Sequence, residues 1–357
     1  VGPRKNRPEG GKERREAVKY GVTIERGAMP WQIFQQDATG KARVELSGTC
    51  TRVRQSFELP LEFTEIRQGA VTVKARIALE SSGESVCPWT ECRVEEDSRW
   101  HVAFDVPAGG LYRVETYMEY EGWDGLSSTR GDMVHNIGVG DVFVAAGQSN
   151  AAGRAKDPIE DGPELGVHLL RPSGRWDLAT HPLGETTGSI HTGNFENHNP
   201  GHTPWLHFAK LLKRELGYPI GIVMTAYGGA PLRWWDMEDN GALYRNMLEL
   251  LEADGLRPRG MVWYQGEAEG YEKAADTYLE RFARFVRRLR EDLGRPNLPV
   301  LTAQLNRCMT PCDMDLDRQW GMVRQAQREA ARRLENVWVV PAIDLPLYDF
   351  IHNSSQG

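Results

Sequence analysis

The residues most able to do chemistry in this sequence are a serine, a histidine and an aspartate. Ser149 follows an apolar run and a glycine, within Gly147-Gln148-Ser149-Asn150. A serine hydroxyl is a weak nucleophile until a base removes its proton, and a histidine oriented by a carboxylate can do this near neutral pH. Asp349 stands three residues before His352, so one tight turn can bring its carboxylate to the imidazole. Asp344 is a second carboxylate near the same histidine, and the acid can be either one.

The sequence also holds candidate donors for the oxyanion that forms when a carbonyl is attacked. Removing one such donor costs roughly 3–4 kcal/mol of transition-state stabilisation. Gly228 or Gly229 can present a backbone N–H with no Cβ in the way. The side-chain amide of Gln265 can supply another donor, and the backbone N–H of Ser149 a third. These residue types point to acyl transfer.

The candidate residues each follow a segment that reads as a β-strand. The predicted strands are Val142–Ala146, Ile220–Thr225, Gly260–Tyr264, Pro299–Gln304 and Val337–Pro341. The predicted helices are Thr203–Leu216, Gly241–Asp254, Lys273–Asp292 and Asp317–Leu334. Strands that alternate with helices in this way predict a doubly wound α/β fold with a parallel sheet. Ligands of such sheets bind beyond the carboxyl ends of the strands, so we expect the candidate residues to meet there.

The N-terminal third has a different pattern. Period-two runs such as Val71–Ile77 and His101–Val106, separated by Gly- and Pro-rich turns, predict an antiparallel β-sandwich. We therefore expect a disordered tail over residues 1–17, a β-sandwich domain over 18–137 and an α/β domain over 138–357. The function of the β-sandwich domain is not legible, although a packing or spacer module is favoured over a glycan-binding one.

Four sequence blocks in this order resemble the SGNH hydrolase superfamily. They are Gly147-Gln148-Ser149-Asn150, Gly228-Gly229 followed by Trp234-Trp235, Trp263-Tyr264-Gln265-Gly266-Glu267, and Asp349-x-x-His352. More narrowly, the blocks resemble the sialate O-acetylesterase-like and acetylxylan esterase branch of the carbohydrate esterases. The resemblance covers about residues 140–357 and implies a three-layer α/β/α, flavodoxin-like hydrolase domain. It also implies metal-independent deacetylation of sugars, with no cofactor.

The resemblance assigns a role to each candidate residue. It makes Ser149 the nucleophile, His352 the base and Asp349 the orienting acid. In the same scheme Gly228 and Gln265 complete an oxyanion hole with the Ser149 N–H. The residues expected around the substrate are Gln148, Asn150, Gly229, Trp234, Trp235 and Glu267.

The function predicted from these blocks is a serine carbohydrate O-acetylesterase that forms an acetyl-enzyme. Its expected partner is an acetylated carbohydrate, either a xylan-type polysaccharide or an O-acetylated sialic acid. One alternative is another short-chain esterase, a lipase or a thioesterase, and another is a non-catalytic glycan-binding protein on the same fold. Glu267 and Glu269 form a poor pair for glycoside hydrolysis, which needs two carboxyl groups on opposite sides of the sugar bond.

The composition excludes several other classes of function. The net charge is −7 and the basic residues form no stripe, so we expect no nucleic-acid partner. No apolar run approaches the roughly 20 residues of a membrane span, so we expect no membrane partner. A secreted or periplasmic location is slightly favoured over a cytoplasmic one, and the sequence does not indicate the oligomeric state.

Metal binding is not expected either. The polar residues His191, Asn194, Glu196, His198, Asn199 and His202 have spacings that match no zinc signature. Loop polarity or substrate contact explains these residues better. The five cysteines allow local pairs at Cys87/Cys92 and Cys308/Cys312, although free thiols are the default expectation.

Overall fold

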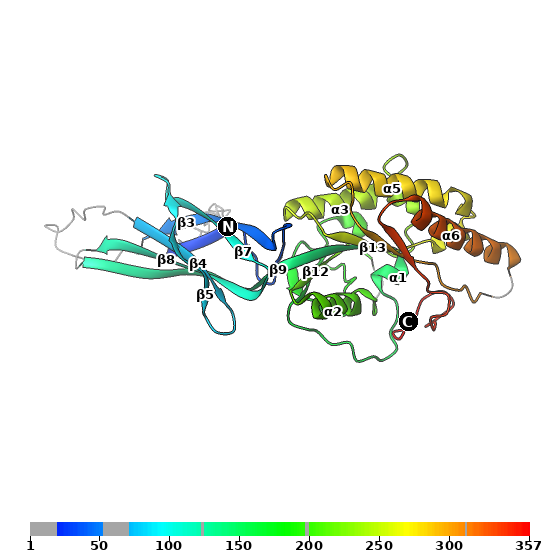
Figure 1. The fold of residues 1–357 in the computed structure, drawn as a ribbon, viewed down its shortest axis with the longest axis horizontal. Helices are drawn as coiled ribbons and strands as arrows, with labels where there is room; N and C mark the ends of the chain where they lie inside the picture. Colours follow the sequence, from blue (N-terminus) through cyan, green and yellow to red (C-terminus); the bar gives the residue numbers. More distant parts are fainter. Residues whose placement is uncertain (1–19, 53–70, 123–124, 197–199, 311–312) are drawn as a thin grey trace, which may run out of the picture.

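A computed structural model describes residues 20–52, 71–122, 125–196, 200–310 and 313–357. The described chain is elongated, with a part made of β-sheets at one end and an α/β part at the other (Figure 1). One long strand, β9 (Gly125–Gly147), runs from the first part into the second. The tail predicted to be disordered, residues 1–17, lies outside the described residues.

The first part consists of antiparallel strands in two sheets. One sheet contains β1 (Gly21–Arg26), β3 (Lys41–Thr51), β7 (Arg99–Pro107) and β6 (Arg93–Val94), in that order. In the other, β5 (Ser85–Glu91), β4 (Val71–Leu79), β8 (Gly109–Gly122) and the first half of β9 are neighbours. Val44 and Trp100 of one sheet share a buried cluster with Ile77 and Val114 of the other. Alternate side chains of each strand therefore fill one core, as a period-two pattern predicts.

The second part is built on a sheet with the strand order β11-β10-β12-β9-β13-β14-β15. Besides β9, its strands are β10 (Val167–Leu170), β11 (Trp176–Leu178), β12 (Ile220–Met224), β13 (Gly260–Tyr264), β14 (Val300–Ala303) and β15 (Val337–Val340). Neighbouring strands are parallel except β11, which is antiparallel to β10. The predicted mixed α/β fold is confirmed.

The strands β10 and β11 are absent from the prediction. They are short and lie in the segment between Gly153 and Thr203, whose sequence has little periodicity. All four residues of β10 are buried, so no alternation of polar and apolar side chains marks the strand.

The strand β9 connects the two parts without a linker. Its first half is antiparallel to β8, and its second half is parallel to β12 and β13. At the junction β2 (Ile33–Gln35) lies parallel to residues 138–140. The Nδ1 atom of His168 in β10 lies 2.7 Å from the Trp31 carbonyl oxygen, which ties the segment before β2 to the second sheet. The expected domain boundary between residues 137 and 138 falls inside this continuous strand.

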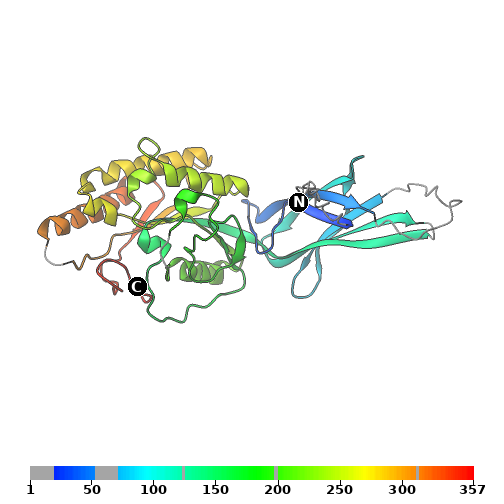
Figure 2. The same cartoon turned by 180° about the vertical axis from the view of Figure 1, so that it is seen from behind.

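Helices cover both faces of the second sheet (Figures 1 and 2). The helices α3 (Ala242–Ala253), α5 (Tyr278–Asp292) and α6 (Met314–Arg333) pack on one face, and α2 (Trp205–Leu216) packs on the other. The helix α5 lies within the predicted helix Lys273–Asp292, and its buried residues recur at a spacing of three and four: Tyr278, Phe282, Phe285, Val286 and Leu289. The helix α6 begins three residues before the predicted start at Asp317, because the Asp313 carboxylate caps it by accepting the N–H groups of Asp315 and Leu316.

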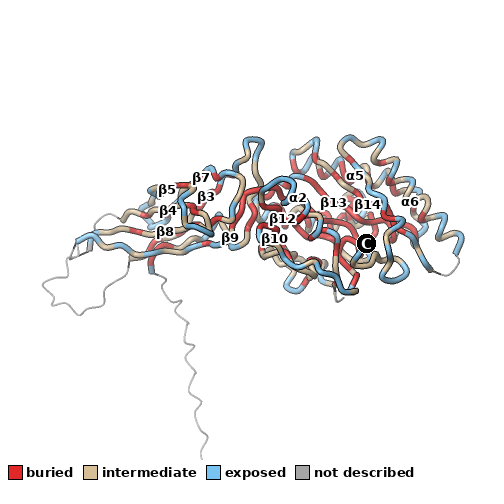
Figure 3. Tube along the Cα trace, turned by 60° about the horizontal axis from the view of Figure 1, so that its bottom comes forward, coloured by how far each residue is buried: buried red, intermediate tan, exposed pale blue. Residues whose placement is uncertain are grey.

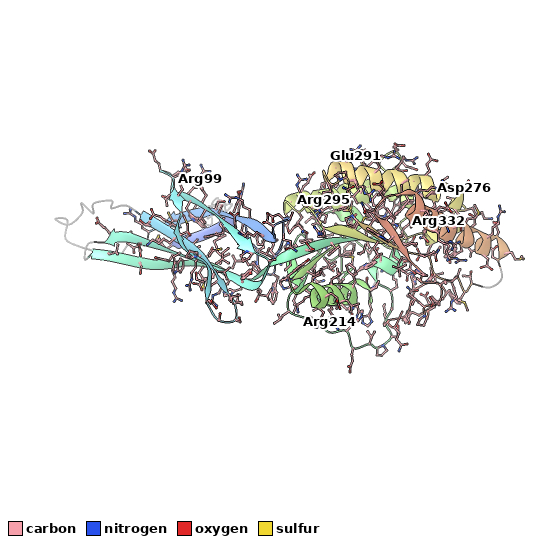
Figure 4. All side chains as sticks on the ribbon, in the orientation of Figure 1. Arg99, Arg214, Asp276, Glu291, Arg295 and Arg332 are labelled. Atoms are coloured by element: carbon pink, nitrogen blue, oxygen red, sulfur yellow. The ribbon has the colours of Figure 1, made fainter. Side chains whose placement is uncertain are left out.

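Burial and charge follow this architecture. The buried residues concentrate along the strands of both parts (Figure 3). The labelled side chains of Arg99, Arg214 and Glu291 are exposed on the outside of the molecule (Figure 4). Across the described ranges, no helix combines the length and hydrophobicity that a membrane crossing requires.

The described cysteines do not form disulfides with one another. Cys50, Cys87, Cys92 and Cys308 are free thiols, and Cys312 lies outside the described residues. The Cys87/Cys92 pair that the spacing allows is therefore not formed. Burial, with a smaller contribution from Glu91, raises the pKa of the Cys92 thiol to about 12. That thiol is consequently protonated and unreactive near neutral pH.

Candidate active site

Ser149 lies at the carboxyl end of β9, where it opens the four-residue helix α1 (Ser149–Ala152). Gly147 has a φ of +129°, and a Cβ there would collide with the backbone of Tyr264 in β13, so the turn requires glycine. The Gln148 N–H donates to the Tyr264 carbonyl oxygen at 2.9 Å, which fixes the turn to the neighbouring strand. Ser149 is 6% exposed and lines a cavity of about 430 Å³.

The second predicted element of the site is the Asp349–His352 turn. The Asp349 carboxylate accepts the backbone N–H groups of Ile351 at 2.9 Å and His352 at 2.8 Å. Its other oxygen lies 2.6 Å from His352 Nδ1. Burial alone would raise the pKa of Asp349, but the bonds from His352 and from these two backbone groups outweigh it and hold the pKa below its usual value. Asp349 therefore stays ionised beside the imidazole, and His352 Nδ1 bonds to this carboxylate and not to that of Asp344.

Five of the predicted residues line the cavity with Ser149, and one of them is its chain neighbour Gln148. Gly228 and Gly229 come from the loop after β12, Glu267 comes from the segment after β13, and His352 comes from the C-terminal loop. Gly229 has a φ of +66°, and a Cβ there would meet open space. The carboxyl edge of the parallel sheet therefore brings together groups that are far apart in the sequence, as expected for an α/β fold.

Arg154 and its ion pair with Glu196 are cavity features that were not predicted. Arg154, five residues after Ser149, lines the cavity and forms an ion pair with Glu196 at 2.6 Å. The Glu196 carboxylate also accepts the backbone N–H of Gly228. The Gly228 N–H, which is the predicted oxyanion donor, therefore already donates to a carboxylate. An arginine just after the short helix that begins at Ser149 was a readable signal for this site, but nothing in the sequence pairs it with a residue 42 positions later.

Gln265 is placed differently from the prediction. It is fully buried and is not among the cavity-lining residues. Its side-chain amide donates to the Ala230 carbonyl oxygen at 3.3 Å and to the Glu269 carboxylate. Glu269 lies one helical turn later, in α4 (Glu267–Tyr271), so it draws the amide into the interior. In this structure Gln265 supports the loop after β12 and does not present a donor to the cavity.

The tryptophans expected near the substrate are also placed elsewhere. Trp235 is fully buried in the core, edge-on to Trp263 at a centroid distance of 5.4 Å. Trp234 is half-buried beside Tyr227 and is not among the described residues that line the cavity. Trp235 is thus a core residue, because the 3-10 turn η3 (Leu232–Trp234) directs the chain back over the sheet. Tyr271, which the prediction missed, places an exposed ring at the cavity.

The predicted residues Gln148, Asn150 and Glu267 connect the loops around the cavity. Gln148 lines the cavity, but its side-chain oxygen accepts the N–H groups of Gly266 at 3.3 Å and Ala268 at 3.2 Å. The Asn150 side chain donates to Glu267 at 2.5 Å. Burial is the main cause that raises the pKa of the Glu267 carboxyl group to about 7.

The described residues offer no metal centre. No group of three or more His, Cys, Asp or Glu side chains within the described ranges is placed to hold an ion. In the polar segment, His202 Nδ1 lies 2.7 Å from Ser355 Oγ and Asn194 accepts a bond from Asn246. His198 and Asn199 lie outside the described residues.

A hydroxyl, an imidazole and a carboxylate around one cavity, at the carboxyl edge of a parallel sheet, are typical of enzymes that hydrolyse esters. Residues 139–357 match the family model described as carbohydrate esterase, sialic acid-specific acetylesterase, and the chain belongs to this family. The protein is therefore a carbohydrate acetylesterase, a carboxylic ester hydrolase. The resemblance to carbohydrate esterases drawn from the four blocks is confirmed.

The chain is also similar to several known proteins. A probable carbohydrate esterase of Arabidopsis thaliana is 29% identical over 239 residues, which cover 60% of this chain and 85% of that protein. An X-ray structure of an Arabidopsis thaliana protein aligns with 27% identity and a TM-score of 0.50, over 60% of this chain and 90% of that one. A carbohydrate acetylesterase from Xanthomonas citri has a similar fold, with 20% identity and a TM-score of 0.53, over 92% of this chain and 72% of that one.

Proposed function

We propose that this protein removes O-acetyl groups from acetylated sugars through an acetyl-enzyme formed on Ser149. The observation that carries the proposal is the cavity lined by both Ser149 and His352, with Asp349 bonded to the far nitrogen of the imidazole. The Asp349 bond leaves His352 Nε2 as the nitrogen available to accept the serine proton. Family membership supports the acetyl ester as the group attacked.

The reaction proceeds in two halves. In the first, His352 removes the proton of Ser149 Oγ while the oxygen attacks the acetyl carbonyl, and the imidazolium then protonates the departing sugar oxygen. In the second, His352 takes a proton from water, which attacks the acetyl-enzyme, and acetate leaves as Ser149 recovers its proton. Asp349 holds the imidazole in the required tautomer and stabilises its charged form.

The oxyanion of each half-reaction requires donors at the cavity. The backbone N–H groups of Ser149 and Gly228 are the donors that the geometry supports. The Glu196 carboxylate already accepts the Gly228 N–H, so the substrate carbonyl must displace it. Gln265 acts indirectly. Its side-chain amide donates to the Ala230 carbonyl oxygen and so stabilises the loop that carries Gly228.

Ionisable side chains at the cavity favour a sugar and a short acyl group. Arg154, Glu267 and Glu272 contribute charged groups to its lining, and Tyr271 contributes a ring that is 48% exposed. An exposed ring of this kind can stack on the C–H face of a sugar. A long alkyl chain would remove water from these groups without offering them hydrogen bonds. Acetylated xylan-type polysaccharide and O-acetylated sialic acid are the proposed substrates.

The test measures acetate release from acetylated xylan, from O-acetylated sialic acid and from p-nitrophenyl acetate. We expect release from at least one sugar substrate, and Ser149→Ala should lose at least about a thousandfold in kcat. Equal activity of Ser149→Ala would refute the mechanism. A chain-length series of p-nitrophenyl esters separates the proposal from a lipase or thioesterase, because activity should fall steeply beyond acetyl.

A further inference from the structure

The residue after the proposed nucleophile is bonded to both neighbours of the proposed base. Asn150 Nδ2 donates to the Ile351 carbonyl oxygen at 3.1 Å, and Asn150 Oδ1 accepts the Asn353 N–H at 2.9 Å. Ile351 and Asn353 flank His352 in the chain. One amide side chain therefore holds the peptide units on both sides of the imidazole-bearing residue. Because Asn150 directly follows Ser149 in α1, these bonds tie the serine and the histidine to one short element.

Glu267 fixes the orientation of this amide. The Asn150 Nδ2 also donates to Glu267 Oε1 at 2.5 Å, and Glu267 is only 1% exposed. If the amide were flipped, its NH2 would face the Asn353 N–H, and its oxygen would face both the Glu267 carboxylate and the Ile351 carbonyl. All three contacts thus select one orientation. Burial keeps water from replacing the bond to Glu267.

A second asparagine holds the same loop from another strand end. Asn306, after β14, donates to the Ile351 carbonyl oxygen and to Asn353 Oδ1, each at 2.8 Å. The loop that carries His352 contributes few buried side chains of its own, since Asp349 and Phe350 are exposed. Its position relative to Ser149 therefore depends on these side-chain bonds rather than on packing.

We propose that Asn150, oriented by Glu267, is a positioning residue that sets His352 against Ser149 for proton transfer. The inference deepens the proposed function and rests on it, because it assumes that Ser149 and His352 carry the reaction. It also replaces the predicted substrate contact of Asn150 with a bond to the catalytic loop. The expected signature is a loss in kcat with little change in KM, since the substrate-binding surface stays in place.

The experiment measures kcat and KM with p-nitrophenyl acetate for Asn150→Ala, Glu267→Ala, Glu267→Gln and the double alanine variant. Asn150→Ala should lose about ten- to a hundredfold in kcat, because a displacement near 1 Å has effects of this size. Glu267→Ala should lose less, and Glu267→Gln should recover most of that loss because its carbonyl oxygen can accept the same bond. The double variant should be no worse than Asn150→Ala alone, since the two residues act in series.

Tyr244→Phe is the matched control. It removes a partly buried hydrogen bond of 2.8 Å, which the Tyr244 hydroxyl in α3 donates to Asp292, far along the chain from the loop. Tyr244→Phe should keep wild-type kcat, although it should change the melting temperature by about as much as Asn150→Ala does. Circular dichroism checks that every variant is folded. If Asn150→Ala does not fold, the Glu267→Ala and Glu267→Gln pair decides the question alone.

Three results would overturn the inference. They are wild-type kcat in Asn150→Ala or Glu267→Ala, a rise in KM without a fall in kcat, and additive losses in the double variant. Ser149→Ala is measured in parallel to separate the two proposals. An inactive Ser149→Ala beside an unaffected Asn150→Ala would refute only the positioning role. An active Ser149→Ala would refute the proposed function itself.

Discussion

At the scale of single residues, the structure distinguishes between two carboxylates near His352. Asp349 bonds to His352 Nδ1 at 2.6 Å, and Asp344 does not bond to this nitrogen. Asp349→Asn should lose about a hundred- to ten-thousandfold in kcat, because an amide favours the wrong imidazole tautomer. Acetate release under saturating substrate measures the effect. Asp344→Asn is the matched control and should keep wild-type kcat. Comparable losses in both variants would show that the acid is misassigned.

Glu196 gives a second prediction at this scale. Its carboxylate accepts the Gly228 N–H and pairs with Arg154, so it competes with the substrate carbonyl for the oxyanion donor. Glu196→Ala removes the competitor, and kcat/KM for p-nitrophenyl acetate should rise by about three- to tenfold. Glu164→Gln, which breaks a partly buried pair with Lys213, is the control and should have no effect. A fall in kcat/KM for Glu196→Ala would mean that its carboxylate assists catalysis.

At the scale of elements, α4 begins with a buried carboxyl group whose ionisation opposes folding. Burial raises the pKa of Glu267 from 4.5 to about 7. The folded state therefore binds the proton more tightly, so the contribution of Glu267 to stability is full below pH 4.5 and is lost as pH rises through about 7. Glu267→Gln does not titrate. Its free energy of unfolding relative to wild type should increase by up to about 3 kcal/mol between these pH values.

Urea unfolding of wild type and Glu267→Gln at several pH values measures this difference. Asp292→Asn, which alters the carboxylate that accepts the Tyr244 hydroxyl, is a control whose difference from wild type should not show the same rise over this range. A difference between wild type and Glu267→Gln that stays constant from pH 4.5 to pH 7 would contradict the raised pKa.

The elements also show how far sequence periodicity can predict structure. Amphipathic helices such as α5 and the apolar strands of the second sheet follow from local spacing alone. The strands β10 and β11 do not, because a short, fully buried strand beside an irregular loop has no period to detect. The Asp349–His352 turn is local and was predictable. The inward turn of Gln265 depends on Glu269, Ala230 and a packed interior, which a list of motifs does not contain.

At the scale of the whole molecule, β9 couples the β-sheet part to the α/β part. The strand belongs to one sheet of the first part and to the sheet of the second part, and the Trp31–His168 bond adds a second connection. We therefore expect a single cooperative thermal transition, with the calorimetric and van't Hoff enthalpies close to each other. Differential scanning calorimetry measures both. Two separated transitions would show that the parts unfold independently and that the shared strand does not couple them.

The burial of His168 predicts how the stability of the protein depends on pH. Desolvation lowers the pKa of His168 from 6.5 to about 4, and its bond to the Trp31 carbonyl only partly opposes the shift. The unfolded state binds the proton more tightly, so this contribution is full above pH 6.5 and is lost as pH falls to about 4. His168→Gln should weaken the pH dependence of the melting temperature in this range. An unchanged dependence would remove His168 as its source.

The central claim, that Ser149 is the nucleophile, is tested most directly by covalent labelling. The protein is treated with a fluorophosphonate, digested, and the modified peptide is sequenced by mass spectrometry. We predict one label, on Ser149, with acetate release lost in proportion to labelling and no label in Ser149→Ala. Full labelling of another residue, or an enzyme that releases acetate without reacting at Ser149, would contradict the account.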